Sequence, residues 1–140
     1  MMTDLMREVR KNIEIRAQHV FAVFPDGAGS PGFAYTIGNA IRGLPELLII
    51  GNFAPTLAAM ILNELGDKMR EDGRPFPEGL ADIGWTYPFK VRRASPSARS
   101  RFTIQAGEYW RTEDYDVLQV MICDREGRYP GDEGCHPDFD

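Results

Sequence analysis

The 140-residue sequence has little cysteine and histidine: Cys123 and Cys135 are its two cysteines, and His19 and His136 are its two histidines. A structural zinc site usually takes four ligands arranged as two close pairs, and a small secreted scaffold usually contains more cysteines. Cys135 and His136 are adjacent, and Cys123 has no neighbouring ligand in the sequence. The spacing therefore predicts no metal site and no disulfide framework, and we expect reduced thiols and no cofactor.

Long apolar runs and an excess of positive charge are also missing. Residues 1–14 carry a charge every few positions, whereas a secretory signal needs an apolar core of about 7–15 residues. No run approaches the roughly 18 apolar residues that predict a membrane-spanning helix. The formal net charge is -5, which opposes binding to phosphate backbones. These absences disfavour membrane and nucleic-acid partners and indicate a cytoplasmic protein.

The familiar catalytic motifs are missing as well. The sequence contains neither the GxSxG pattern of hydrolases nor the GxxxxGK[ST] phosphate-binding loop. Residues 26–32, DGAGSPG, are rich in glycine, but no predicted helix follows them to hold an anion. No motif therefore fixes a reaction type, and the question of whether the protein is an enzyme stays open.

The length and the 43% hydrophobic content are those of one globular domain, residues 1–140. Leu5, Val9 and Ile13 are apolar residues spaced four positions apart, which predicts a helix over residues 3–16. A second apolar stripe predicts a helix over 54–72, and a third helix is expected within 95–111, opened by Ser95-Pro96. Short runs rich in β-branched and aromatic residues predict strands at 19–25, 33–38, 46–52, 85–94 and 116–124.

This order of elements predicts an α+β fold. Short loops between the first three strands favour antiparallel pairing. We therefore expect a single domain with a mostly antiparallel sheet of about five strands and two or three packed helices, those at 3–16 and 54–72 covering one face. Residues 124–140 are rich in turn-forming and acidic residues, which predicts a loose acidic tail.

Polar residues crowd into the block at 32–52, between two apolar runs. They are Tyr35, Thr36, Asn39, Arg42 and Glu46. Glu46 opens the most apolar strand, where a buried carboxylate would need a partner. An ion pair with Arg42 or a bond to the backbone would fix the turn. The alternative is a catalytic acid or base, because perturbed carboxylates cluster at active sites.

Two further polar residues join this candidate site. Gln119 interrupts the apolar run VLQVMIC, so it either lines a pocket or satisfies a neighbouring backbone group. His19 begins the first predicted strand and is a second candidate general base. Polar groups that converge on an apolar sheet predict a ligand pocket, and its expected binding residues are Tyr35, Thr36, Asn39, Arg42, Glu46 and Gln119.

Five motifs resemble those of a bacterial family, the domain of unknown function 4262 (DUF4262). They lie at Pro31–Gly38, Pro45–Leu47, Leu62–Asn63, Leu118–Val120 and Asp124–Pro130. The resemblance covers roughly residues 13–135 and implies a shared fold, but no particular chemistry. Asn39, Leu44 and Gly131 stand where the family commonly has leucine, histidine and tryptophan.

The sequence thus predicts a small cytoplasmic bacterial protein that binds a small polar ligand beside residues 32–52. One alternative is an enzyme, in which Glu46 or His19 is the general base and Arg42 binds an anionic substrate. Another is an immunity or regulatory module, in which the acidic tail meets a basic protein partner.

Overall fold

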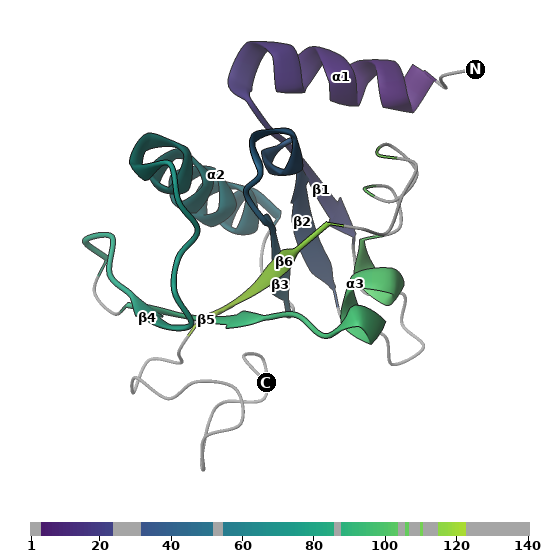
Figure 1. Ribbon diagram of the computed structural model, residues 1–140. Coiled ribbons are helices and arrows are strands. Elements are labelled where there is room, and N and C mark those ends of the chain that lie inside the picture. The colour runs from purple at the N-terminus through teal and green to yellow at the C-terminus, as the bar shows by residue number, and fades with distance from the viewer. Residues whose placement is uncertain are drawn as a thin grey trace.

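A computed structural model describes residues 4–23, 32–51, 55–85, 88–103, 106, 110 and 115–122 (Figure 1). In chain order the elements are α1 (Asp4–Arg16), β1 (His19–Val23), β2 (Phe33–Ile37), the 3-10 helix η1 (Asn39–Arg42), β3 (Glu46–Ile50), α2 (Pro55–Asp72), β4 (Gly79–Ala81), β5 (Phe89–Arg93), α3 (Pro96–Phe102) and β6 (Val117–Met121).

Six strands form one sheet in the order β1-β2-β3-β6-β5-β4. Every neighbouring pair is antiparallel except β3 and β6, which run parallel with Glu46 opposite Val117. The predicted α+β fold and mostly antiparallel sheet are confirmed. The sixth strand, β4, lies in a proline-containing stretch for which the sequence predicts no strand; it has three residues at the edge of the sheet, and its Leu80 is exposed.

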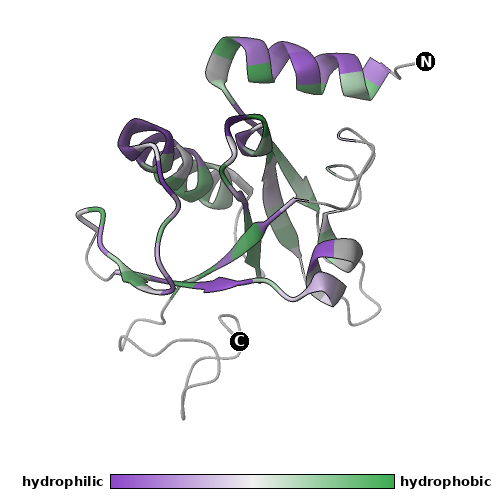
Figure 2. Cartoon of the chain, in the orientation of Figure 1, coloured by the Kyte–Doolittle hydropathy of each residue, from purple (hydrophilic) through white to green (hydrophobic). Residues whose placement is uncertain are grey.

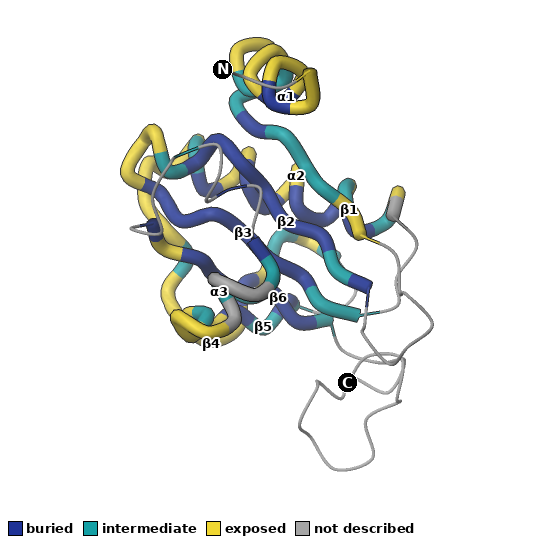
Figure 3. Tube along the Cα trace, turned by 90° about the vertical axis from the view of Figure 1, so that its right-hand side faces the viewer, coloured by how far each residue is buried: buried dark blue, intermediate teal, exposed yellow. Residues whose placement is uncertain are grey.

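The sheet buries both faces, since successive residues of a strand point to opposite sides. Leu47 and Ile49 of β3 lie in a core cluster covered by α2. Leu48 lies in the other cluster, with Val9 of α1. The prediction that α1 and α2 cover one face is therefore wrong: the unbroken apolar run of β3 supplies a core on each side. Figure 3 shows β2 and β3 as the buried centre, with the outer turns of α1 exposed.

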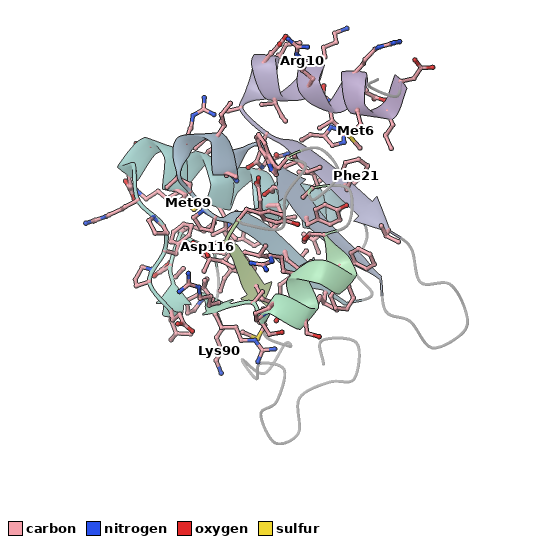
Figure 4. All side chains as sticks on the ribbon, turned by 45° about the vertical axis from the view of Figure 1, so that its right-hand side comes forward. Met6, Arg10, Phe21, Met69, Lys90 and Asp116 are labelled. Atoms are coloured by element: carbon pink, nitrogen blue, oxygen red, sulfur yellow. The ribbon has the colours of Figure 1, made fainter. Side chains whose placement is uncertain are left out.

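The helices present apolar sides to the sheet and polar sides to solvent. Hydropathy follows this division: α1 is largely purple, and green is concentrated on the central strands, whereas β5 is largely purple (Figure 2). Arg10 extends from the outer side of α1, whereas Met6 is buried on the side towards the strands (Figure 4). α3 begins at Pro96, as the Ser95-Pro96 pair predicts. The φ angle of Pro96, which the proline ring fixes, suits the first position of a helix.

None of the helices in the described part of the chain has the length and apolar character needed to cross a membrane. The predicted acidic tail at 124–140 lies outside the described residues.

Replacing Ala17 by glycine should stabilise the protein. Ala17 ends α1 with φ +73°, a left-handed conformation that costs a residue with a Cβ about 1–2 kcal/mol. We expect the free energy of unfolding, measured by urea denaturation, to rise by about 1 kcal/mol. Gly73→Ala is the matched control, because Gly73 ends α2 with φ +70° and the same N–H to C=O bond of 2.9 Å four residues back. The free energy of unfolding of Gly73→Ala should fall by a similar amount. A change of the same sign in both variants would contradict the backbone argument.

Candidate functional site

The carboxylate of Glu46 lies at the centre of the candidate site, where it is completely buried at the start of β3. Its two oxygens accept hydrogen bonds of 3.0–3.2 Å from the Thr36 hydroxyl, the Trp110 indole N–H, and the backbone N–H groups of Gly38, Asn39 and Ala40. Three consecutive amides thus converge on one carboxylate, in the manner of a backbone anion nest.

Gly38 permits this turn. It adopts φ +139°, and a Cβ at this position would overlap the carbonyl oxygen of Ala17. Glycine alone takes such a conformation readily and allows so close an approach. Gly43, at φ +71°, ends η1 with its N–H on the Ala40 carbonyl. The chain therefore folds back over the start of β3 and brings its amides onto Glu46.

Burial raises the pKa of the Glu46 carboxyl, while the bonds from the Gly38–Ala40 amides and the Thr36 hydroxyl limit the rise. Because both oxygens of the Glu46 carboxylate already accept hydrogen bonds from the protein, neither oxygen is open to a substrate that would donate a proton. To act as a general base, Glu46 would have to leave these donors. The geometry thus favours the turn-fixing interpretation of Glu46 over the catalytic one.

Thr36 and Asn39 extend the hydrogen bonding away from Glu46. The Thr36 Oγ1 accepts from the backbone N–H of Leu47 at 2.9 Å and from Asn39 Nδ2 at 3.3 Å. The same amide nitrogen donates to Gln18 Oε1 at 3.1 Å, and Asn39 Oδ1 accepts from Arg70 NH1 at 2.6 Å. β2, η1 and α2 are thereby joined by side chains.

Gln18 connects this cluster to the backbone of α2. Its Nε2 donates to the Leu62 carbonyl at 3.2 Å and to Asn63 Oδ1 at 2.9 Å, and its Oε1 accepts from Arg70 NH1 at 2.7 Å. A Cβ on Gly66 would overlap the Gln18 Oε1. A glycine in the middle of α2 thus makes room for Gln18. We call Gln18, Thr36, Asn39, Glu46 and Arg70 the polar network.

The structure brings together three of the predicted site residues, namely Thr36, Asn39 and Glu46. Arg42 is exposed on η1 and is not among the groups bonded to the Glu46 carboxylate. Of the two turn-fixing interactions that the sequence suggests, the described residues form the backbone bonds and not the ion pair.

Three other predicted residues lie apart from the polar network. Tyr35 is buried in the second core cluster and stacks on Phe21 with ring centroids 5.6 Å apart. Gln119 accepts a hydrogen bond of 3.1 Å from Arg92 Nε, so its amide meets a side chain of the neighbouring strand. His19 lies on the edge strand β1.

His19 is held by α1. The Asn12 Nδ2 group lies 2.7 Å from His19 Nδ1. Because an amide nitrogen only donates, Nδ1 accepts and the ring proton is on Nε2. Burial lowers the pKa of His19, against a smaller opposite effect of Glu8. The neutral imidazole thus ties α1 to β1.

A pocket of about 580 Å³ opens at the C-terminal end of α2, lined by Asp72, Arg74, Pro75, Phe76 and Pro77. Phe76 also packs on the core cluster under α2, which fixes its ring. The lining begins two residues after Arg70, the outermost member of the polar network, and includes none of the residues predicted for a pocket beside 32–52.

The described residues contain no group of three or more histidine, cysteine, aspartate or glutamate side chains that could hold a metal ion. Cys123, Cys135 and His136, three of the candidate metal ligands in the sequence, lie outside the described residues.

Residues 12–136 match a known family, described as Domain of unknown function (DUF4262). The chain belongs to the DUF4262 family. The match confirms the resemblance predicted over roughly 13–135 and contains the whole polar network of this DUF4262 protein. No curated protein and no solved structure matches the chain.

Sequence reasoning missed Gln18, Arg70 and Trp110. Gln18 and Arg70 are 52 positions apart, and nothing local marks either as a partner of Asn39. One usable signal was present: Gly66 inside a strongly helical stretch indicates close approach by another group. Arg70 lies one turn beyond Gly66 on the same side of the helix, which is where that group sits.

Glu46→Gln should destabilise the protein strongly. The substitution places an amide NH₂ where an oxygen accepts buried N–H donors, so at least one donor and the new NH₂ lose partners. We expect the free energy of unfolding to fall by about 3 kcal/mol in urea denaturation. Glu64→Gln is the matched control, because Glu64 also accepts from an indole, Trp85 Nε1 at 2.6 Å, but is exposed. Similar losses in both variants would show that burial of the Glu46 carboxylate is unimportant.

The contribution of His19 to stability should fall as the pH falls from about 7 to about 5. The pKa of His19 is lowered from 6.5 in the folded protein, so the unfolded chain takes up this proton first. Protonated Nδ1 also loses its bond from Asn12. The wild type and His19→Gln should be compared by urea unfolding across this range. The variant should show the shallower pH dependence, and parallel curves would exclude His19 as the cause.

Proposed function

We propose that this DUF4262 protein binds a small anionic ligand without reacting with it, on a surface formed by η1 and the C-terminal half of α2. Arg42 and Arg70 would supply positive charge, and Asn39 would hold the two elements together. The observation that carries the proposal is the anchoring of Arg70, whose side chain is only 11% exposed and is held by neighbouring oxygens.

The charge of Arg70 is weakly compensated. Its NH1 group donates to Gln18 and Asn39, whose side chains are neutral. Its NH2 group donates to Asp67 at 2.6 Å, but the Asp67 side chain is 74% exposed. Ion pairs with such exposed partners contribute at most about 1 kcal/mol and are screened by salt. A fixed guanidinium of this kind suits a carboxylate or phosphate.

Arg42 lies on the same short helix as Asn39, which anchors Arg70. η1 spans Asn39–Arg42, and residues three apart in a 3-10 helix lie one above the other, about 6 Å along the axis. Since Asn39 contacts Arg70, Arg42 extends from the same side of η1. Arg42 is exposed, and no hydrogen bond or ion pair between described residues occupies its guanidinium. It is therefore available to a ligand.

Glu46 has a supporting role in this proposal. Its bonds to the Gly38–Ala40 amides fix the turn that presents Asn39 and Arg42. A general-base role for Glu46 receives no support from this arrangement, because ligand and carboxylate would lie on opposite sides of the turn. We also propose the bacterial cytoplasm as the location, since the motifs resemble those of a bacterial family and cysteine is scarce.

The proposal is tested by titrating ¹⁵N-labelled protein with sodium acetate and with inorganic phosphate at constant ionic strength. We expect saturable shifts in the amide signals of residues 39–42 and 66–74. Arg42→Ala should weaken binding about fivefold or more, which corresponds to the loss of one exposed charged contact. This variant leaves the polar network intact, so it should unfold at the same urea concentration as the wild type.

Arg7→Ala is the control variant. Arg7 is also an exposed arginine, but it lies on α1 and pairs with Asp4 at 2.9 Å. Its removal changes net charge equally and should leave the affinity unchanged. Non-saturating shifts, or the same loss of affinity in both variants, would refute a specific anion site.

A further inference from the structure

The sheet ends on one side in β1, an edge strand that pairs with β2 alone. The ladder next to it fixes the direction of its backbone groups. The N–H of Gly51 donates to the carbonyl of Gly32 at 2.8 Å, and the pairing of Phe33 with Ile50 places these two glycines opposite each other. In an antiparallel ladder such a directly bonded pair recurs at every second residue. Even-numbered residues of β2 therefore turn their backbone groups towards β3, and odd-numbered residues turn theirs towards β1.

The backbone groups on the outer side of β1 belong to Val20 and Ala22. Tyr35 of β2 lies opposite Phe21, so Phe21 exchanges its backbone hydrogen bonds with β2. Val20 and Ala22, on either side of Phe21, turn their N–H and C=O groups the other way. No hydrogen bond between two described residues occupies these groups. In Figures 1 and 3, α1 lies over the start of β1, and the rest of the strand runs on away from it. The outer side of β1 is therefore an open edge.

β1 lacks the features that usually protect an edge strand from pairing. Proteins protect such edges with charged side chains, proline, bulges or very short strands. β1 is five residues long, with the sequence HVFAV, and contains no proline, lysine, arginine or carboxylate. Its pairing with β2 runs through all five residues without a bulge. Val23, at the end of the strand, is an exposed apolar side chain. The edge thus has the character of an unfinished sheet.

The opposite edge of the sheet, β4, offers much less. The N–H of Ala94 bonds the carbonyl of Val117 at 2.8 Å, directly across the ladder of β5 and β6. By the same alternation, Val91 of β5 bonds β4, where Gly79 lies opposite it. Leu80 is then the single residue of the three-residue β4 whose backbone groups point outwards. An edge of this kind is protected by its shortness.

We propose that the open edge of β1 pairs antiparallel with β1 of a second copy of this chain, which joins two six-stranded sheets into one dimer. The strand is self-complementary about Phe21. With Phe21 of both copies at the twofold axis, the outward groups of Val20 meet those of Ala22 in the other copy. On one face the two Phe21 side chains are cross-strand neighbours, and His19 lies opposite Val23 of the other copy.

The geometry favours a second copy over other occupants of the edge. Among the registers that a twofold axis allows, the one centred on Phe21 is the one that pairs all five residues of β1. This pairing uses each open edge once and closes at two copies, whereas pairing of β1 with β4 would continue from copy to copy as a fibre. The inference is independent of the proposed anion surface, which lies on η1 and α2.

Sedimentation equilibrium of the full-length protein tests this inference, and we expect a reversible dimer. Ala22→Pro removes an outward N–H and places a proline ring on the open edge, a position where proline leaves the ladder with β2 intact. Because the dimer loses one hydrogen bond from each copy, its dissociation constant should rise at least about tenfold. The amide signals of β3 and α2 should stay those of the wild type.

Ala22→Val is the matched control, because it enlarges the same exposed side chain but keeps the N–H. This variant should form the dimer as strongly as the wild type. A dimer that both variants weaken equally, or that neither weakens, would place the interface elsewhere and overturn the inference.

Amide hydrogen exchange of the wild type decides the question if Ala22→Pro does not fold. In the dimer, the N–H groups of Val20 and Ala22 should be as protected as that of Phe21, which bonds β2 within each copy. Dilution below the dissociation constant should release Val20 and Ala22 and leave Phe21 protected. A wild type that stays monomeric, with freely exchanging Val20 and Ala22 amides, would overturn the self-pairing and leave the edge to a strand of another protein.

Discussion

The centre of this fold depends on one buried carboxylate. A charged group removed from water costs several kcal/mol unless it is paired and fully hydrogen-bonded. The described donors to Glu46 are neutral: the Gly38–Ala40 amides, the Thr36 hydroxyl and the Trp110 indole. Amides reach the carboxylate only when the chain after β2 folds tightly over the start of β3. The position of η1 therefore follows from the burial of Glu46.

The same turn also determines how the helices sit. Asn39, the first residue of η1, contacts both Gln18 and Arg70. Gln18 in turn bonds the backbone of α2, in a space that exists because position 66 is glycine. The segment after α1, the turn after β2 and the second half of α2 thus form one cooperative unit. A change at any of these points is expected to affect the other two, because contacting residues are not energetically independent.

Local patterns predicted the elements well, since periodicity and turn residues report burial directly. The helices at 3–16 and 54–72 and the strands around β1, β2, β3, β5 and β6 all followed from such patterns. Glu46 was also identifiable, because a carboxylate at the head of an apolar strand must find partners. Its partners were not identifiable in full: Gln18, Arg70 and Trp110 are distant in sequence, and only the fold brings them near. The assignment of both helices to one face failed for a related reason: a local pattern shows which side of a helix is buried, but only the fold decides which face of the sheet the helix covers.

The polar network changes where function is to be sought. A buried polar cluster is weak evidence for stability, because apolar residues of similar volume often serve as well. What the polar network does specifically is position side chains. It holds the guanidinium of Arg70 between η1 and α2, and it fixes the turn that carries Arg42. Glu46, which the sequence marked as a candidate catalytic group, and Thr36, which it marked as a ligand-binding residue, are sealed inside. We therefore propose that recognition belongs to the side chains one layer further out, which the sealed residues keep in place.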